Sequence, residues 1–179
     1  MERVRLLRPE VKQAIAAIAG LVRQAYNIET PIKNVESLVE TLGGKLVYAP
    51  DAKVYKSAKD SFVIEVPTSR GEDFIRYSTA RMIGHLFLHM GYQVAPSVWD
   101  KQRVNESFWD TPDCGSIELY QAHQFAVELL MPEDEFSDKL YELANQREDE
   151  RVNISDLGKY FGVSNELVLR RAKAIDLII

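Results

Sequence analysis

The segment from Asp73 to Met90 is apolar on nearly every side, and this feature constrains the fold more than any other. A helix with apolar residues around its whole circumference is stable in water only when neighbouring elements bury it. We therefore expect a buried central helix here. Gly84 lies inside it and lowers helix propensity by about 1 kcal/mol relative to Ala. This predicts that another element packs closely against the backbone at Gly84.

Shorter helical patterns lie on both sides of this segment. Pro9 begins the first helix, Thr30-Pro31 separates it from the second, and Gly43-Gly44 ends the second. Two further helices are expected over 116–131 and 134–143. The connection 91–115 between them and the central helix is long, and loops of that length in compact domains often cover or line a site.

Three short strands are expected between the second helix and the central helix. They cover 45–49, 53–56 and 62–66, which are rich in β-branched and aromatic residues. The polar connections at Pro50-Asp51 and 57–61 are typical of hairpins, so we predict a small three-stranded antiparallel sheet. The fold class is α+β and mainly helical.

Charge divides the chain into two parts. The 22 basic and 27 acidic side chains give a net charge of −5, which argues against nucleic-acid binding over the whole surface. Residues 151–179 hold five basic and three acidic side chains, so they carry +2 and the first 150 residues carry −7. We predict one domain over 1–150 and a short C-terminal segment over 151–179 packed on it.

Cysteine content and hydropathy point to the cytoplasm. Cys114 is the single cysteine and cannot form an internal disulfide. The longest nearly unbroken apolar run, 14–22, is about half the length of a membrane span. No apolar signal core follows the first residues. We therefore expect a cytoplasmic protein without membrane contact.

Two segments carry a family resemblance. Residues 81–89 read R-M-I-G-H-L-F-L-H, and residues 121–132 read Q-A-H-Q-F-A-V-E-L-L-M-P. Together they resemble the ImmA/IrrE family of zinc metallopeptidases, whose central helix carries A-H-E-x-G-H-x-x-x-H and whose next helix carries E-A-N-x-F-A-x-x-L-L-M-P. The resemblance implies a zincin-like fold for 1–150, the IrrE N-terminal-like domain, with a degenerate H-E-x-x-H motif in this chain.

The family's catalytic positions fall on residues of the wrong chemistry. The resemblance places the first zinc ligand at Arg81, the general base at Met82, the second ligand at His85 and the third ligand at Gln121. Arginine stays protonated and has no lone pair for a metal, and a thioether accepts no proton from water. A neutral amide is a weak zinc ligand. We therefore expect no catalytic residues, no metal and no cofactor.

Two alternatives keep chemistry at this site. His85 and His89 are four residues apart and are the candidates for a relocated metal site, in which case the cofactor is zinc. A packing role at the helix end is the plainer interpretation of His89. In the other alternative the Arg81 guanidinium replaces the metal and donates to Gln121, with Glu118 as a carboxylate partner; otherwise Arg81 extends to solvent and Met82 packs in the core.

The C-terminal segment resembles a helix-turn-helix. A helix from Ile154, a tight turn at Gly162 and a helix capped by Ser164 are expected. The candidates for nucleic-acid contact are Arg170, Arg171 and Lys173. A net charge of +2 is small for neutralising phosphates, so direct DNA binding is a lesser expectation than a structural role.

The resemblance suggests three functions. Family members often lie beside a helix-turn-helix repressor gene in mobile elements such as phages and act on that repressor. The first interpretation is a catalytically inactive, peptidase-like regulatory protein that binds a protein partner such as that repressor without cutting it. The alternatives are an active metal-dependent peptidase with unusual ligands, and a DNA-binding regulator that works through the C-terminal segment.

Overall fold

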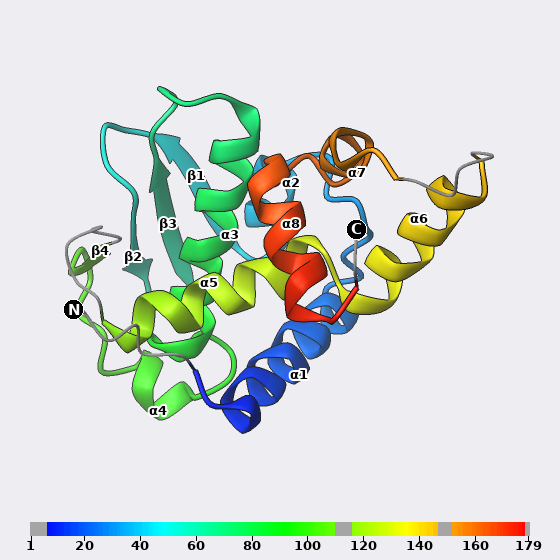
Figure 1. The fold of residues 1–179 in the computed structure, drawn as a ribbon. Helices are drawn as coiled ribbons and strands as arrows, with labels where there is room; N and C mark the ends of the chain where they lie inside the picture. Colours follow the sequence, from blue (N-terminus) through cyan, green and yellow to red (C-terminus); the bar gives the residue numbers. More distant parts are fainter. Residues whose placement is uncertain (1–6, 110–115, 147–151, 178–179) are drawn as a thin grey trace, which may run out of the picture.

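The computed structural model describes residues 7–109, 116–146 and 152–177, whose eight helices and four strands form an α+β fold (Figure 1). The helices are α1 (Pro9–Ala25), α2 (Val35–Thr41), α3 (Glu72–Leu88), α4 (Pro96–Trp99), α5 (Ile117–Leu130), α6 (Glu133–Asn145), α7 (Ile154–Phe161) and α8 (Asn165–Ala174). The strands are β1 (Gly44–Tyr48), β2 (Lys53–Ala58), β3 (Ser61–Val66) and β4 (Ser107–Trp109). No helix within the described ranges is long and apolar enough to cross a membrane.

The sheet is mixed and four-stranded, which corrects the expectation of three antiparallel strands. Its order is β1-β3-β2-β4. β2 and β3 form an antiparallel hairpin in which Val54 faces Ile64. β1 runs parallel to β3 on the other side, with Leu46 opposite Ile64. The hairpin expected at Pro50-Asp51 is therefore wrong, because β3 lies between β1 and β2.

The fourth strand comes from the long connection after the central helix. β4 pairs antiparallel with β2, and Phe108 faces Val54. Three residues are too few to give a periodic signal in the sequence, so the strand forms only because β2 offers a free edge. Earlier in the same connection, Trp99 is 5% exposed and donates from Nε1 to the Lys59 carbonyl at 2.7 Å. Cys114 lies outside the described residues.

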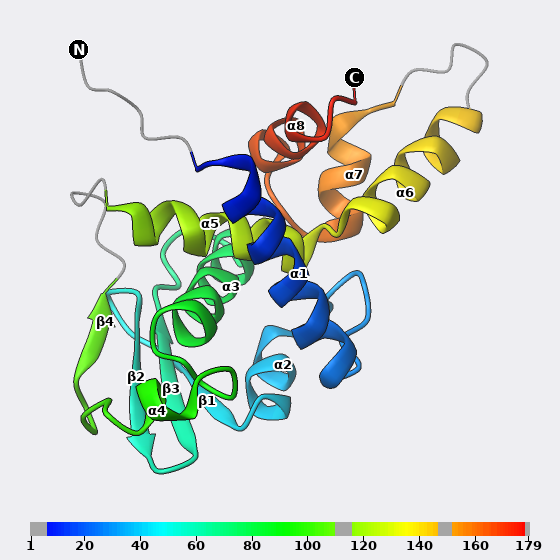
Figure 2. The same cartoon turned by 90° about the horizontal axis from the view of Figure 1, so that it is seen from below.

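The central helix α3 lies between the sheet and α5, as its apolar surface predicts. α3 contacts β2 and β3 on one side and α5 on the other (Figure 2). Met82 and Leu86 are fully buried within it. A Cβ atom at Gly84 would lie 3.0 Å from the Ala122 carbonyl oxygen of α5, which confirms the close approach that the glycine predicts.

The C-terminal helices α7 and α8 pack on the body of the molecule. Gly162 joins them with a φ of +65°, and the Ser164 hydroxyl caps α8 by accepting from the Leu167 amide at 3.3 Å. The Arg76 guanidinium of α3 donates to the Gly162 carbonyl at 2.6 Å, and the rings of Phe136 and Phe161 stack at 5.6 Å. The predicted helix from Ile154, the turn at Gly162 and the helix capped by Ser164 are confirmed. The predicted domain boundary after residue 150 falls within 147–151, which lie outside the described residues.

Candidate functional site

Four polar side chains lie along one face of α3. Tyr77, Arg81, His85 and His89 follow one another at intervals of four residues, which places them on the same side of a helix. Residues 77–88 belong to α3, and His89 is its C-terminal cap. We call these four residues the polar stripe.

α5 crosses α3 and supplies a partner to each end of the polar stripe. The crossing brings Ala122 against Gly84. On one side of Ala122, the Gln121 amide oxygen lies 3.0 Å from His89 Nε2. On the other side, His123 Nδ1 lies 2.6 Å from the Tyr77 hydroxyl. We call His85, His89 and Gln121 the histidine end, and Tyr77 with His123 the tyrosine end.

Hydrogen bonds at the histidine end define the tautomers of both imidazoles. The Gln121 amide oxygen can only accept, so His89 Nε2 donates to it. His89 Nδ1 then carries a lone pair and accepts from His85 Nδ1, which is 2.9 Å away. His85 Nε2 is consequently unprotonated, and this buried atom has no hydrogen-bond partner among the described residues.

Burial keeps both imidazoles of the histidine end uncharged at neutral pH. His85 is 0% exposed, and the Phe108 ring of β4 lies 4.6 Å from its ring. Desolvation lowers the pKa of His85 to about 3, and the neighbouring His89 and Arg81 act in the same direction. Desolvation also lowers the pKa of His89, against the smaller raising effects of Gln121 and Glu118.

Arg81 lies in the middle of the polar stripe. Its guanidinium carbon is 5.5 Å from the centroid of the Tyr77 ring, and its charge lowers the pKa of both His85 and His123. The Gln121 oxygen accepts from His89 rather than from Arg81. Met82 points the other way and is 0% exposed in the core.

The residues at the histidine end do not fit a zinc ion. Zinc sites in proteins use three or four Cys, His, Asp or Glu ligands. Within the described ranges, no group of three such side chains is placed to hold a metal. The Nδ1 atoms of His85 and His89 are hydrogen-bonded to each other, and the permanent cation of Arg81 lies one turn before His85 on the same helix.

The tyrosine end was not among the candidate sites that the sequence indicated. Residues two apart on a helix are separated by about 200°, so Gln121 and His123 leave α5 in different directions. Because α5 crosses α3, the two side chains reach opposite ends of one stripe. The available signal was the position of Tyr77, four residues before Arg81. Burial, Arg81 and Arg170 lower the pKa of His123 to about 4, in that order of effect.

The three basic residues predicted to contact nucleic acid have different surroundings. Arg171 is 2% exposed and forms two 2.8 Å hydrogen bonds to the Glu128 carboxylate of α5. Arg170 is exposed and paired with Glu166 at 2.6 Å, and Lys173 is exposed. Arg171 therefore joins α8 to the body and is not at the surface.

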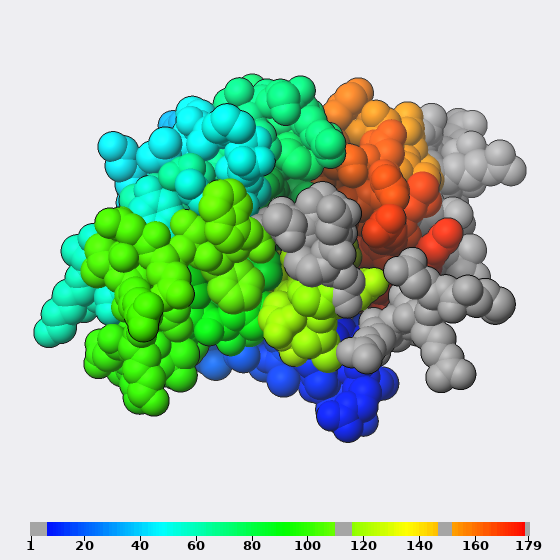
Figure 3. All heavy atoms as spheres, turned by 90° about the vertical axis from the view of Figure 1, so that its left-hand side faces the viewer, coloured from blue at the N-terminus to red at the C-terminus, as the bar shows by residue number. Residues whose placement is uncertain are grey.

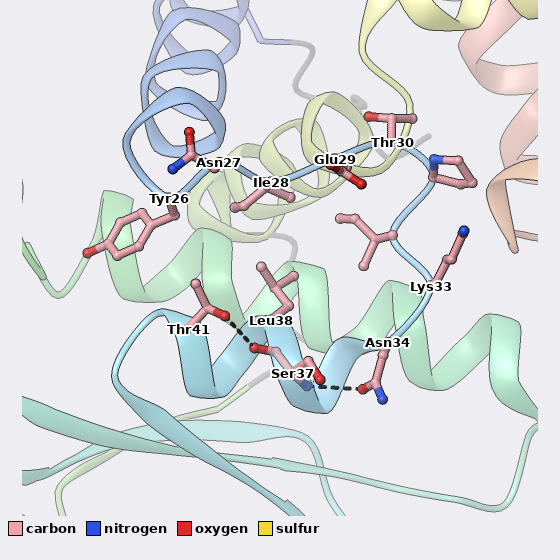
Figure 4. Close-up of a pocket in the computed structure, with 12 residues that line it drawn as sticks. Tyr26, Asn27, Ile28, Glu29, Thr30, Lys33, Asn34, Ser37, Leu38 and Thr41 are labelled. Atoms are coloured by element: carbon pink, nitrogen blue, oxygen red, sulfur yellow. Dashed lines mark hydrogen bonds between the residues drawn. The ribbon is translucent and has the colours of Figure 1, made fainter.

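A separate cavity of about 370 Å³ lies between residues 26–34 and α2 (Figure 4). Ile28 and Leu38 extend into it from opposite sides. Asn34 caps α2 by accepting from the Ser37 amide at 3.0 Å, and the Thr41 hydroxyl donates to the Ser37 carbonyl at 2.8 Å. These polar groups stabilise the helix itself, so the cavity shows no group committed to a ligand.

In this fold the histidine-bearing helix α3 lies between a small sheet and a second helix, α5. The sequence model described as the IrrE N-terminal-like domain, of the M78 peptidases, matches residues 80–173, which is more than half of the chain. The chain belongs to this family. The matched region runs past residue 151 and includes α7 and most of α8.

Comparison with other proteins adds a likeness in fold. A solved structure of a Mycobacterium tuberculosis transcriptional regulator superposes with a TM-score of 0.57 at 18% identity, over 92% of this chain and 50% of that one. This chain thus spans half the length of that regulator, and the likeness shows the fold alone. No curated protein matches the chain.

Proposed function

We propose that this chain is a non-catalytic member of the family that regulates by binding a protein partner, such as a helix-turn-helix repressor, without cutting it. The observation that carries this proposal is the hydrogen-bonded chain from His85 through His89 to Gln121. These atoms bond to each other at the place where a peptidase needs a metal, a water and a base. Lone pairs that take part in these hydrogen bonds are not free to bind a metal, and Arg81 and Met82 can supply neither a metal ligand nor a base.

An exposed apolar surface beside the histidine end supports the binding of a protein. Four large apolar side chains on the segment 91–109 are 40–53% exposed. They are Val94, Val98, Val104 and Trp109. This segment covers part of the face shown in Figure 3; the ring of its Phe108 stacks on His89 and lies tilted against His85. Exposed apolar groups gathered near a site are typical of protein interaction surfaces.

An active metallopeptidase is the second candidate, and one observation favours it. His85 Nε2 is buried and has no hydrogen-bond partner among the described residues. A lone pair left without a partner in the interior costs about 1–3 kcal/mol. A metal ion bound to Nε2 would remove that cost, but the cation at Arg81 opposes it.

Metal content separates the two candidates. Protein purified without chelator should contain well under one zinc per chain, and a helix-turn-helix repressor tested as the partner should form a complex with it and stay intact. The variant Arg81→His, Met82→Glu, Gln121→Glu restores the family's ligands and should bind about one zinc. A control, Arg81→Asn, Met82→Leu, Gln121→Asn, changes the same positions without adding a strong ligand and should stay metal-free.

Because Met82 is fully buried, a charged residue there will lower stability. The double variant Arg81→His, Gln121→Glu leaves Met82 in place and should bind zinc without gaining hydrolysis. One zinc ion in the wild-type protein, or cleavage of the repressor that a chelator stops, would show that the chain is a peptidase. A folded double variant that binds no zinc would show that the family positions are assigned wrongly.

A further inference from the structure

Lys56 is a buried lysine of β2 that has no carboxylate partner. It is 5% exposed, and none of the ion pairs formed within the described ranges includes it. Its ammonium donates to the Trp99 carbonyl at 3.0 Å and lies 4.8 Å from the centroid of the Trp99 ring. A buried cation without an anion is costly, because the carbonyl and the ring replace only part of its hydration. Stability alone therefore does not explain a lysine at this position.

Lys56 attaches the segment 92–105 to the sheet at two points. This segment, which we call the anchored segment, contains α4 and lies beside the β2–β3 hairpin (Figure 2). The Lys56 side chain bonds Trp99 in its middle, and the Lys56 carbonyl accepts from the Asn105 amide at its end, at 2.9 Å. A third attachment comes from Trp99 Nε1, which donates to the Lys59 carbonyl at 2.7 Å. The position of the anchored segment thus depends on Lys56 more than on any neighbour in β2.

The anchored segment carries most of the exposed apolar surface that supports partner binding. Val94, Val98 and Val104 are 50%, 40% and 53% exposed. β4 follows shortly after the segment, and its Phe108 ring covers the histidine end. A change in the position of the anchored segment would therefore move both the apolar surface and this cover.

A directional hydrogen bond selects one position of the segment, which apolar packing does not. An apolar side chain at position 56 would avoid the cost of a buried charge, but could pack against the Trp99 ring in several arrangements. The Lys56 ammonium permits only arrangements that keep the Trp99 carbonyl within hydrogen-bond distance. A segment already held in one arrangement loses less conformational entropy when a partner binds it.

We propose that Lys56 is a positioning residue, which holds the anchored segment in the arrangement that a protein partner binds and in which Phe108 covers the histidine end. A segment that samples other arrangements would bind the partner more weakly, in proportion to the time it spends in them. The binding part of this proposal rests on the function proposed above, whereas the effect of Lys56 on the anchored segment does not.

Nuclear magnetic resonance of the Val94 and Val98 methyl groups in Lys56→Met tests the proposal. Methionine is similar in length to lysine and keeps the contact with the Trp99 ring. The Trp99 carbonyl still accepts from the Gln102 amide at 3.0 Å, so no buried carbonyl is left unpaired and the urea midpoint should stay close to that of the wild type. The wild type should give one narrow set of methyl signals, and the variant doubled or broadened signals.

Fluorescence quenching gives a second measurement. The chain has two tryptophans, so Trp109→Phe leaves Trp99 as the single fluorophore. In that background Lys56→Met should raise the quenching of Trp99 by acrylamide about threefold, because Trp99 then visits arrangements that reach solvent. Lys59→Met is the matched control and should change neither signal, since Lys59 is exposed and bonds Trp99 through its backbone.

Binding completes the test. A helix-turn-helix repressor that forms a complex with the wild type should bind Lys56→Met about tenfold more weakly, and Lys59→Met within about twofold of the wild type. Narrow methyl signals and unchanged quenching in Lys56→Met would overturn the proposal. So would a Lys56→Met protein that does not fold, because Lys56 would then serve stability. If no repressor binds the wild type, the proposed function fails, and the methyl signals and quenching still decide the role of Lys56.

Discussion

The two ends of the polar stripe on α3 are built from similar groups but differ in access to solvent. At the histidine end, Phe108 of β4 covers the imidazoles and His85 is 0% exposed. At the tyrosine end, a cavity reaches His123 beside α8. In both places α5 supplies the partner, through Gln121 or His123. The comparison teaches that one helix crossing can create a sealed polar cluster and an open one, depending on what covers each side.

The largest expected effect comes from breaking the buried ion pair that joins α8 to α5. Glu128→Ala leaves the buried Arg171 charge without its bidentate partner, and should lower the free energy of unfolding by about 4 kcal/mol. Urea unfolding measures this. The double variant Glu128→Leu, Arg171→Met removes both charges and should recover most of the loss. A loss below about 1 kcal/mol in Glu128→Ala would mean that α8 is not held by this pair.

Both ends depend on the crossing at Gly84, so widening it should damage both. Gly84→Val places a branched side chain at a position where even a Cβ atom would lie 3.0 Å from the Ala122 carbonyl oxygen. We expect a loss of about 3 kcal/mol in the free energy of unfolding, from overpacking between two backbones. The exposed Gly20 of α1 has no atom within 4 Å of its Cβ position, so Gly20→Val is the control and should cost far less.

The pH dependence of the free energy of unfolding should distinguish the histidine end from the tyrosine end. The folded-state pKa values of His85 and His123 are about 3 and about 4, below the ordinary 6.5. The unfolded chain therefore binds more protons than the folded one between these values. The contribution of the two neutral imidazoles to the free energy of unfolding is present above pH 6.5 and is lost as pH falls. At pH 5 each histidine should lower the free energy of unfolding by about 2 kcal/mol relative to pH 7. Below about pH 4 only His85 should continue to destabilise the fold.

Urea unfolding at pH 7 and pH 5 checks this in the wild-type protein and in His85→Phe and His123→Phe. Each variant should lose about 2 kcal/mol less than the wild type over that interval. An identical pH dependence in all three proteins would show that neither imidazole is held neutral by the fold.

The smallest effect is expected at the surface of the open cavity. Arg170→Gln breaks a pair with Glu166 that is mostly exposed, and should change the free energy of unfolding by less than about 0.5 kcal/mol. Thermal or urea unfolding measures this directly. A loss of several kcal/mol would mean that Arg170 holds α8 in place.

Much of the local structure and part of the site were predictable from the sequence. The helix that begins at Pro9, the glycines that end the second helix, and the tight turn at Gly162 are all seen in the structure. The motif positions also led to His85, His89 and Gln121, which do lie together. The parallel pairing of β1 with β3, the strand β4 and the Tyr77–His123 contact were missed, because each depends on partners far away in the chain.

Sequence alone determined most of the helices and the chemistry that Arg81 and Met82 cannot supply. Helical periodicity and caps act over a few residues, and Arg81 and Met82 lack a metal ligand and a base wherever they point. Only the tertiary structure decided that His85 is sealed, that His123 reaches an open cavity, and that Arg171 is buried against Glu128. Those outcomes depend on how α5 crosses α3 and on where α8 packs, since burial and pairing arise from contacts between distant segments.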